Sequence, residues 1–311
     1  MRPENHKSYL PAVFHITTER LRTMSRKLDV KGMSPVITTI ILASTILACV
    51  LTAYFQVTGV LIAQSQHMEF QQAEHVLTSL ADIIENTLYS PGSAGYVRFD
   101  YLSTRPNLIR TGLTATLKIF NMHTGESNEI SLALNIVEIE GGFLVSTSWE
   151  TVLGSRSVIN GSEYSTIVIS PLDRLAKVQV LQLNGPRIVL DFGRFKVIYA
   201  GIAGLNSSVK YNVIEVSAVN ITFGTINGTE QLALIAKNTG VTVHIWEFSS
   251  SEDLCIQVKG YKILAKDYSL SEELGTTKPV RLSDLFDDFN PALPTIVRVS
   301  IFQVEISMEG R

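Results

Sequence analysis

The chain is poor in cysteine and in charge, and both shortages exclude whole classes of protein. Only two of its 311 residues are cysteines, Cys49 in an apolar run and Cys255 far away in the polar part, so no disulfide is expected. The sequence is therefore not that of a disulfide-stapled secreted domain. Charged residues make up 18% and apolar residues 45%, a composition too apolar and too low in charge for a disordered chain.

Positive charge is missing from one long stretch, since no Lys or Arg occurs between residues 33 and 97. Residues 1–32 carry seven Lys/Arg against three Asp/Glu, whereas the remainder carries nineteen against twenty-six. The positive-inside rule places residues 1–32 in the cytoplasm and the rest outside the cell. Nothing in this distribution is typical of a basic nucleic-acid surface, so no nucleic-acid partner is expected.

Catalytic motifs are also missing, because HExxH, GxSxG, Walker-loop and GxGxxG patterns do not occur. Ser207 to Lys210 fits SxxK, but that pattern is short and its companion motifs are absent. The sequence thus predicts no enzyme and no cofactor. The absence of these motifs disfavours the hypothesis of an extracellular enzyme on a stalk.

No residue cluster has the spacing of a metal site. His67 and His75 are eight apart, whereas a metal pair on a helix needs a spacing of three or four, so surface histidines are the better interpretation. His244 lies in a predicted strand beside Trp246, where a packed or edge position is favoured over a catalytic base.

An acidic cluster, "LSDLFDDFNP", is the remaining candidate. A short helix capped by Ser283 and ended before Pro291 explains Asp284, Asp287 and Asp288 without a cation. Calcium is the weaker alternative, because the regular oxygen-ligand spacing of a calcium loop is missing. The sequence therefore predicts no metal site.

The charge-free stretch has the length of a membrane span. Val36 to Phe55 gives 20 residues, roughly 30 Å of helix, which matches the hydrocarbon core. Its many Val, Ile and Thr residues favour a strand in water, but lipid forces the backbone to satisfy its own hydrogen bonds as a helix. Ser34 is a good N-cap and Pro35 fits the first turn. Gly59 either bends the helix or allows close helix approach.

An amphipathic pattern extends this helix beyond the membrane span. Apolar residues recur at helical spacing, and Glu69, Glu74, Asp82 and Glu85 supply polar positions. The apolar stripe consists of Val76, Leu77, Leu80, Ile83, Ile84 and Leu88. "YSPGSAG" ends the helix. The pattern predicts one helix from Met33 to Leu88.

The junction in front of the helix, "KGMSPVI", resembles the class III signal sequence of archaeal type IV pilins and archaellins. In that family a prepilin peptidase cuts after the Gly of a basic residue–Gly pair and leaves the apolar segment as the new N-terminus. The resemblance implies a cleavage site formed by Lys31, Gly32, Met33, Ser34 and Pro35, with the bond Gly32–Met33 cut. It covers less than a tenth of the chain.

The resemblance gives the charged leader a physical role. Each Lys or Arg costs about 2.5–3.5 kcal/mol at the middle of the bilayer, so the leader holds the helix end in the cytoplasm. Its removal leaves a charge-free helix that can leave lipid and pack against identical helices. The implied partners are a prepilin peptidase, identical or related pilin subunits and, before assembly, membrane lipid.

Two features depart from the family pattern. Many type IV pilins carry Glu at the fifth mature position, where this chain has Ile37, so no Glu–N-terminus pair sets the register of assembly. The leader is also long, and Met24 is a second candidate start that would leave the compact leader "MSRKLDVKG". The alternative hypothesis is an uncleaved, single-span membrane protein with an extracellular binding or adhesion domain.

The part after Tyr96 has the period of strands. Leu113 to Ile119 and Leu254 to Val258 alternate apolar with polar residues, which puts Cys255 on a polar face as an inert surface or edge thiol. Asn184-Gly185 marks a hairpin. Asn238-Thr239-Gly240 marks a tight turn between two strands, a weak motif that also resembles archaeal pilin-like ectodomains. A change of phase at Ile301-Phe302 predicts a bulge.

The expected fold class is α+β, with a long N-terminal helix followed by a β-rich, β-sandwich-like outer domain. The expected division is a leader at 1–32, a transmembrane or filament-core helix at 33–90 and an extracellular domain at 96–311. A further boundary inside the outer part is considered at Gly201 to Ser208. No internal repeat or low-complexity tract is found.

Four Asn-x-Ser/Thr sequons occur, all in the predicted outer part: Asn160, Asn206, Asn220 and Asn227. Chance alone gives a similar number, so unmodified turn asparagines are an equal alternative to N-glycosylation.

Overall fold

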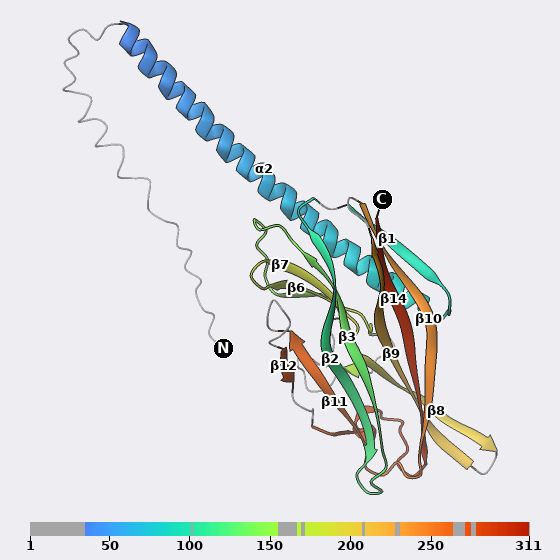
Figure 1. Ribbon diagram of the computed structural model, residues 1–311. Helices are drawn as coiled ribbons and strands as arrows, with labels where there is room; N and C mark the ends of the chain where they lie inside the picture. The colour runs from blue at the N-terminus through green and yellow to red at the C-terminus, as the bar shows by residue number, and fades with distance from the viewer. Residues whose placement is uncertain are drawn as a thin grey trace, which may run out of the picture. The chain divides into compact units, whose positions relative to one another are not determined.

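The computed structural model describes residues 35–100, 102–154, 167–168, 172–206, 209–227, 231–263, 271–274 and 278–310. The chain divides into two compact units, Met1–Val60 and Leu61–Arg311. A long apolar N-terminal helix is followed by a strand-rich region (Figure 1), so the predicted α+β class is confirmed at that level.

The helix α2 (Pro35–Thr87) contains 53 residues and runs through Gly59 without interruption. Its predicted last residue, Leu88, lies one position beyond the observed end. Ser90, whose backbone N–H bonds the Thr87 carbonyl, and Gly92, with φ at 86°, turn the chain into the first strand. The predicted stop at "YSPGSAG" is therefore confirmed.

The part of α2 inside the second unit buries the predicted apolar stripe. Leu77, Leu80 and Ile84 are fully buried, and Ile83 packs partly buried at the edge of the same cluster. Phe70 and Ala73 extend the stripe by two turns toward the N-terminus. The 3.6-residue period therefore identified the buried face of this segment correctly.

Two sheets form the rest of the second unit in the described residues. The six-stranded sheet has the order β1 (Ala94–Asp100), β10 (Gln231–Phe248), β14 (Thr295–Gly310), β9 (Val209–Asn227), β8 (Phe195–Asn206), β5 (Ile167–Val168). The eight-stranded sheet has the order β12 (Ser271–Leu274), β11 (Leu254–Ile263), β2 (Arg105–Asn121), β3 (Ser127–Glu140), β7 (Pro186–Asp191), β6 (Lys177–Gln182), β4 (Glu150–Leu153), and β13 (Val280–Arg281) pairs with β11. Neighbours are antiparallel except for the parallel pairs β9–β14 and β5–β8.

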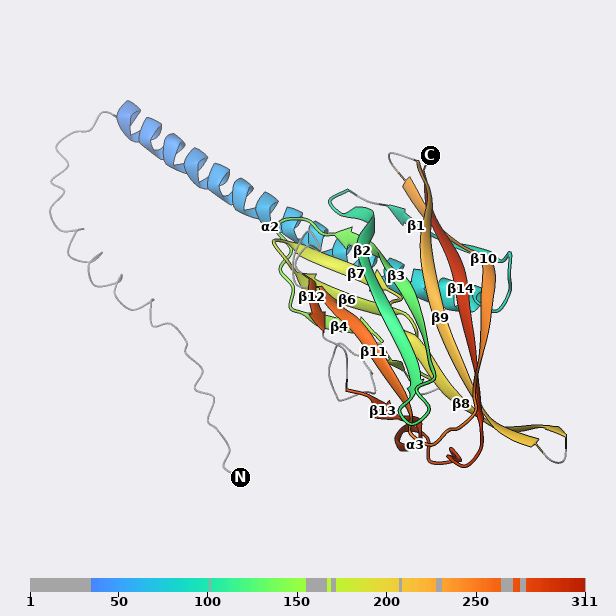
Figure 2. The ribbon, with the colours of Figure 1, turned by 60° about the horizontal axis from the view of Figure 1, so that its bottom comes forward.

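Two large apolar cores hold these elements together. In the helix core, α2 packs on β9, β10 and β14 of one sheet and on β3, β6 and β7 of the other. In the inter-sheet core, β2, β3 and β11 pack directly on β8, β9 and β14. Figure 2 shows the two sheets and the C-terminal part of α2 from a second side.

The long strands β9 and β14 contribute residues to both cores, one face of the strand to each core. In β14, alternate residues from Val297 to Ile301 lie in the inter-sheet core, and alternate residues from Phe302 to Ile306 lie in the helix core. The pairing of β14 with β9 runs from Thr295 to Ile306 without a shift. The predicted bulge at Ile301-Phe302 is therefore wrong, because the change of phase marks a change of core and not an extra residue.

The predicted turn at Asn238-Thr239-Gly240 is also wrong. β10 continues through these residues as one strand, and the irregularity is a bulge in which Thr239 has no register partner on β14, although its hydroxyl donates to the Gln303 carbonyl at 3.2 Å. Asn238 is fully buried, and its side-chain amide donates to the carbonyls of Thr87 and Leu88 at 2.9 and 2.8 Å. The polar residue is thus explained by the carbonyls at the end of α2 and not by a solvent-exposed turn.

Cys255 is fully buried, so its prediction as a surface or edge thiol is wrong. β11 pairs with β2 on one side and with β13 on the other, and Leu254 and Ile256 are buried beside the thiol. Burial raises the pKa of the Cys255 thiol. The burial of three consecutive residues, Leu254 to Ile256, departs from the alternation expected of a half-buried strand.

The other local predictions have mixed outcomes. β6 and β7 form the predicted hairpin around Asn184-Gly185, with φ of 55° and 145° at the two turn residues. The short helix near the acidic cluster is α3 (Leu282–Leu285), but Arg281 occupies its N-cap, so the predicted cap at Ser283 is wrong. The described part of Gly201 to Ser208 lies in the hairpin of β8 and β9, within one sheet.

Candidate functional site

The candidate functional site is the apolar segment, which we define as Pro35–Val60 of α2, the described part of the first unit. No side chain of this segment is buried. Its large apolar residues are about half exposed or more, as at Ile40 with 62%, Leu47 with 60% and Phe55 with 69%. By length and composition this helix can cross a membrane.

Four hydroxyl groups of the apolar segment donate hydrogen bonds to carbonyls of their own helix. Thr39 donates to the carbonyl of Val36 at 2.8 Å, and Ser44 and Thr45 both donate to Ile41 at 2.9 and 2.7 Å. Thr52, about two turns after Thr45, donates in the same way to the carbonyl of Ala48. A helix in lipid or against other apolar helices has no water for its polar groups, so this internal bonding suits either environment.

In the second unit, Glu69 fastens α2 to the connection between β1 and β2. Its carboxylate accepts backbone N–H groups of Leu102, Ser103 and Thr104 at 2.6, 2.9 and 3.0 Å, together with the hydroxyls of Ser103 and Thr104. Burial alone would raise the pKa of Glu69, but these hydrogen bonds outweigh it and lower the pKa to about 2. Glu69 is therefore a charged fastening and not a proton donor near neutral pH.

A second fastening joins the last turns of α2 to the segment before β6. Arg174 forms an ion pair with Asp82, and Glu85 accepts the backbone N–H of Ala176 at 3.0 Å. The hydrogen bond that Arg174 donates to the Asp82 carboxylate raises the pKa of Arg174. The polar positions of the amphipathic stretch thus hold neighbouring backbone in place.

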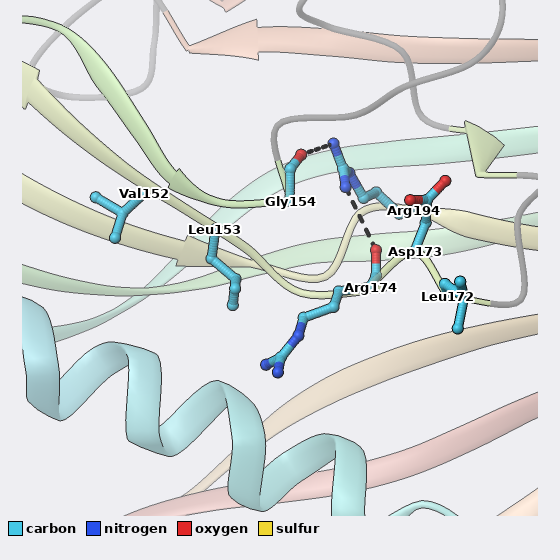
Figure 3. Close-up of a pocket in the computed structure, with 7 residues that line it drawn as sticks. All are labelled: Val152, Leu153, Gly154, Leu172, Asp173, Arg174 and Arg194. Carbon is cyan, nitrogen blue, oxygen red and sulfur yellow. Dashed lines mark hydrogen bonds between the residues drawn. The ribbon is translucent and has the colours of Figure 1, made fainter.

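A cavity of about 380 Å³ lies next to this fastening and is lined by Val152, Leu153, Gly154, Leu172, Asp173, Arg174 and Arg194. Figure 3 shows the Arg194 guanidinium between the carbonyls of Gly154 and Arg174, to which it donates hydrogen bonds. Arg194 is only 2% exposed, and burial lowers its pKa while Asp191, Asp173 and Glu85 oppose that shift. The Lys196 ammonium donates to the Asp173 carbonyl at 2.8 Å.

These cations bind backbone carbonyls and stand among carboxylates. Within the described residues, the Nε of Arg194 has no hydrogen-bond partner, but the nearby Asp173, Asp191 and Glu85 balance its charge. Among the described residues that line the cavity, no nucleophile lies beside a base. We therefore interpret the residues around this cavity as structural, because their hydrogen bonds hold the segment before β6 against the chain that follows β7.

The predicted cleavage site falls mostly outside the described residues. Lys31, Gly32, Met33 and Ser34 lie outside them, and Pro35 is the first residue of α2. Pro35 therefore occupies the first helical position that its missing N–H favours.

The predicted sequons lie in different settings. Asn160 is outside the described residues, and Asn206 is the last residue of β8. Asn220 is half-buried in β9 and donates to the Gln303 side chain at 2.8 Å, so a glycan there would have to break that bond. Asn227 is exposed at the end of β9.

The histidines and acidic residues considered as metal ligands or, for His244, as a catalytic base are exposed. His67 and His75 are exposed on α2, and His244 is exposed on β10. Asp284, Asp287 and Asp288 are exposed around α3. Among the described residues, no group of three or more His, Cys, Asp or Glu side chains could hold a metal ion.

Comparison of the chain with models of protein families, with curated proteins and with solved structures finds no match. The functional argument therefore rests on the apolar segment and on the residues that precede it.

Sequence reasoning missed the fastening residues Glu69, Arg194 and Asn238. Glu69 and Asp82 look like ordinary polar positions of an amphipathic helix, and their partners are about 33 and 92 residues away in the chain. A polar residue inside an otherwise apolar strand, as at Asn238, was the one available signal.

Proposed function

We propose that the protein is a structural subunit of an archaeal type IV pilus-like or archaellum-like surface filament. The observation that carries this proposal is an exposed, charge-free apolar helix segment directly preceded by the Lys31-Gly32 junction. After cleavage at Gly32–Met33, the apolar segment would leave the bilayer and form part of a bundle of like helices. Ala, Ser, Thr and Gly residues in the segment would allow close approach.

In this proposal the subunit begins as a single-pass membrane protein with a cytoplasmic N-terminus. The strand-rich unit would be a β-sandwich-like domain outside the cell and then on the filament surface. Glu69, Asp82 and Glu85 support this division, because they fasten the C-terminal part of α2 to that unit and leave Pro35–Val60 for other contacts.

The test is co-expression of the full chain with an archaeal prepilin peptidase, followed by N-terminal sequencing and sedimentation of the product. We expect a product that begins at Met33 and sediments with fibres. Gly32→Val should abolish cleavage. Gly59→Ala is the matched control, because a Cβ at Gly59 meets open space, and it should be cut like the wild type.

The alternative is an uncleaved, membrane-anchored binding or adhesion protein, which the same apolar segment would also anchor. Protein that retains residues ahead of Met33 and never sediments with fibres would favour this alternative over the filament subunit.

A further inference from the structure

The six-stranded sheet has an open edge along the second half of β10. Residues 231–237 of β10 pair with β1, but the pairing with β1 ends at Lys237. From Gly240 to Phe248, β14 is the only strand that pairs with β10 within the described residues. The backbone groups on the other side of this stretch are therefore available to another strand.

Apart from Glu247, this β10 edge lacks the charged residues and prolines that normally prevent pairing between sheets. Its sequence, "GVTVHIWEF", contains no Lys, Arg or Pro. Val243 is 45% exposed and Ile245 is 64% exposed. Proteins usually protect a free edge with charged residues, proline or a short strand, so an unprotected edge of nine residues indicates an interaction surface.

The opposite edge of the same sheet is also open. β5 pairs with β8 only at Phe195 and Lys196, so the outer side of β8 from Val197 onward has no strand partner in the described part of the chain. β9 pairs with β14 only from Asn212 onward. The described residues 201–206 and 209–211 thus form a two-stranded arm, which Figures 1 and 2 show running past the other strands.

The arm is largely apolar and, within the described residues, has no further strand partner. Ile202 is 51% exposed, and Ala203 and Gly204 are also exposed. An isolated two-stranded hairpin is marginally stable in water, so pairing with a further strand would stabilise the arm.

The β10 edge and the arm that contains the β8 edge carry opposite charge. Residues 240–248 contain one carboxylate, Glu247, and no Lys or Arg. The open stretch of β8, residues 197–206, has no charged residue, and its partner strand in the arm carries Lys210. Each edge would therefore meet the other more favourably than it would meet itself.

We propose that the open β10 edge of one copy pairs with the β8 edge of a second copy, so that the six-stranded sheet continues from subunit to subunit. Because the two edges are on opposite sides of the sheet, the contact is head-to-tail and leaves a free edge at each end for further copies. β8 and β10 run in the same direction within the sheet, so copies in like orientation join through a parallel ladder. This inference rests on the proposed function in one respect: a filament would hold its copies in like orientation.

The test uses the full chain co-expressed with the prepilin peptidase in two differently tagged versions. One version carries Val243→Cys and the other Ala203→Cys, both with Cys49→Ala, while the buried Cys255 is left in place. A short bis-maleimide reagent is added to membranes and to sedimented fibres. Ser131→Cys, an exposed position on β3 of the other sheet, replaces each partner in turn as the control.

We expect cross-links between the two tagged versions in severalfold excess over the Ser131→Cys controls. Adding Ile245→Lys should reduce them severalfold while the thermal unfolding of the strand-rich unit stays unchanged. Cross-links only between two Val243→Cys copies would indicate antiparallel pairing of like edges and overturn the proposal, as would a yield no higher than the controls.

Leader removal and sedimentation, measured in the same samples, separate the two proposals. Processed fibres without the expected cross-link would overturn the edge pairing alone. The expected cross-link in protein that keeps its leader would overturn the filament subunit and leave the edge pairing standing.

Discussion

At the scale of single residues, polar side chains hold backbone that lies outside regular secondary structure. Glu69 accepts the N–H groups of Leu102 to Thr104, Asn238 donates to the carbonyls that end α2, and Arg194 donates to the Gly154 carbonyl. Each replaces a partner that a helix or sheet would otherwise supply. Their removal should therefore affect stability before it affects any binding.

Glu69→Gln is expected to destabilise the strand-rich unit in a pH-dependent way. The pKa of Glu69 in the folded chain is about 2, below its ordinary value of 4.5, so the carboxylate stabilises the fold fully above about pH 4.5. That contribution is lost as the pH falls toward 2. Hydrogen bonds to a charged group contribute about 1.5–3 kcal/mol, which sets the expected loss at pH 7.

The measurement is urea unfolding of wild type and Glu69→Gln between pH 7 and pH 2. The difference between the two should shrink on acidification and disappear near pH 2. Glu129→Gln, at an exposed position of β3, is the control and should show no such convergence. A constant difference at every pH would contradict the role given to the Glu69 charge.

At the scale of elements, α2 combines two kinds of helix surface. The apolar segment exposes its apolar residues, whereas the stretch from Phe70 to Leu88 buries one stripe and fastens its polar residues to loops. The apolar segment therefore needs apolar surroundings, whereas the stretch from Phe70 to Leu88 contributes to the core of the strand-rich unit.

Leu47→Lys tests the surroundings of the apolar segment. A Lys near the middle of the bilayer costs about 2.5–3.5 kcal/mol on insertion scales, so membrane insertion should fall. Alkaline extraction of membranes measures the inserted fraction. Leu102→Lys places the same charge at a residue that is 95% exposed in the strand-rich unit, and it should leave insertion unchanged. Equal insertion of both variants would show that the apolar segment does not lie in lipid.

The ladder between β3 and β7 contains a buried ion pair that offers a sharper test of strand packing. Arg187 is 4% exposed and donates to both oxygens of Glu138, which is 1% exposed, at 2.8 Å. Glu138→Ala leaves a buried cation without its main carboxylate and should cost about 3–5 kcal/mol.

The double variant Glu138→Leu with Arg187→Met should recover most of that loss, because an apolar pair of similar volume can replace a buried ion pair. Chemical denaturation of wild type, Glu138→Leu, Arg187→Met and the double variant gives the coupling energy of the pair. A double variant less stable than Glu138→Ala would contradict this account of the pair.

The sequence predicted these elements unevenly, for physical reasons. The stripe on α2 and the hairpin at Asn184-Gly185 depend on local period and turn chemistry, and both are found. Cys255 and Asn238 were misplaced because their surroundings come from distant strands and from the end of α2. Alternation along a strand tells which residues are buried, but it does not tell that a strand has two cores.

At the scale of the whole molecule, the C-terminal part of α2 belongs to the core of the strand-rich unit, while the apolar segment belongs to the other unit. The cleavage site could be proposed from residues 31–35 alone, because it is a linear motif. The open β10 edge could not, because only the strand order shows which part of β10 lacks a partner.

A matched pair of substitutions on the one helix tests this division. Leu80→Ala removes a fully buried side chain and should cost about 2–5 kcal/mol in the unfolding of the strand-rich unit. Leu47→Ala, at a residue that is 60% exposed, should leave that unfolding unchanged. Calorimetry of the full chain in detergent measures both, and a similar loss for the two variants would contradict the separation into units.

The two-faced use of β9 and β14 has a consequence for how the gene can change. Deleting or inserting a single codon just before Val297 would rotate every later side chain of β14 to the wrong face, so both hydrophobic clusters would lose their lining at once. Length variation should therefore be tolerated in the hairpin turns and rejected in these strands, and a deletion scan read out by protein abundance would show that contrast.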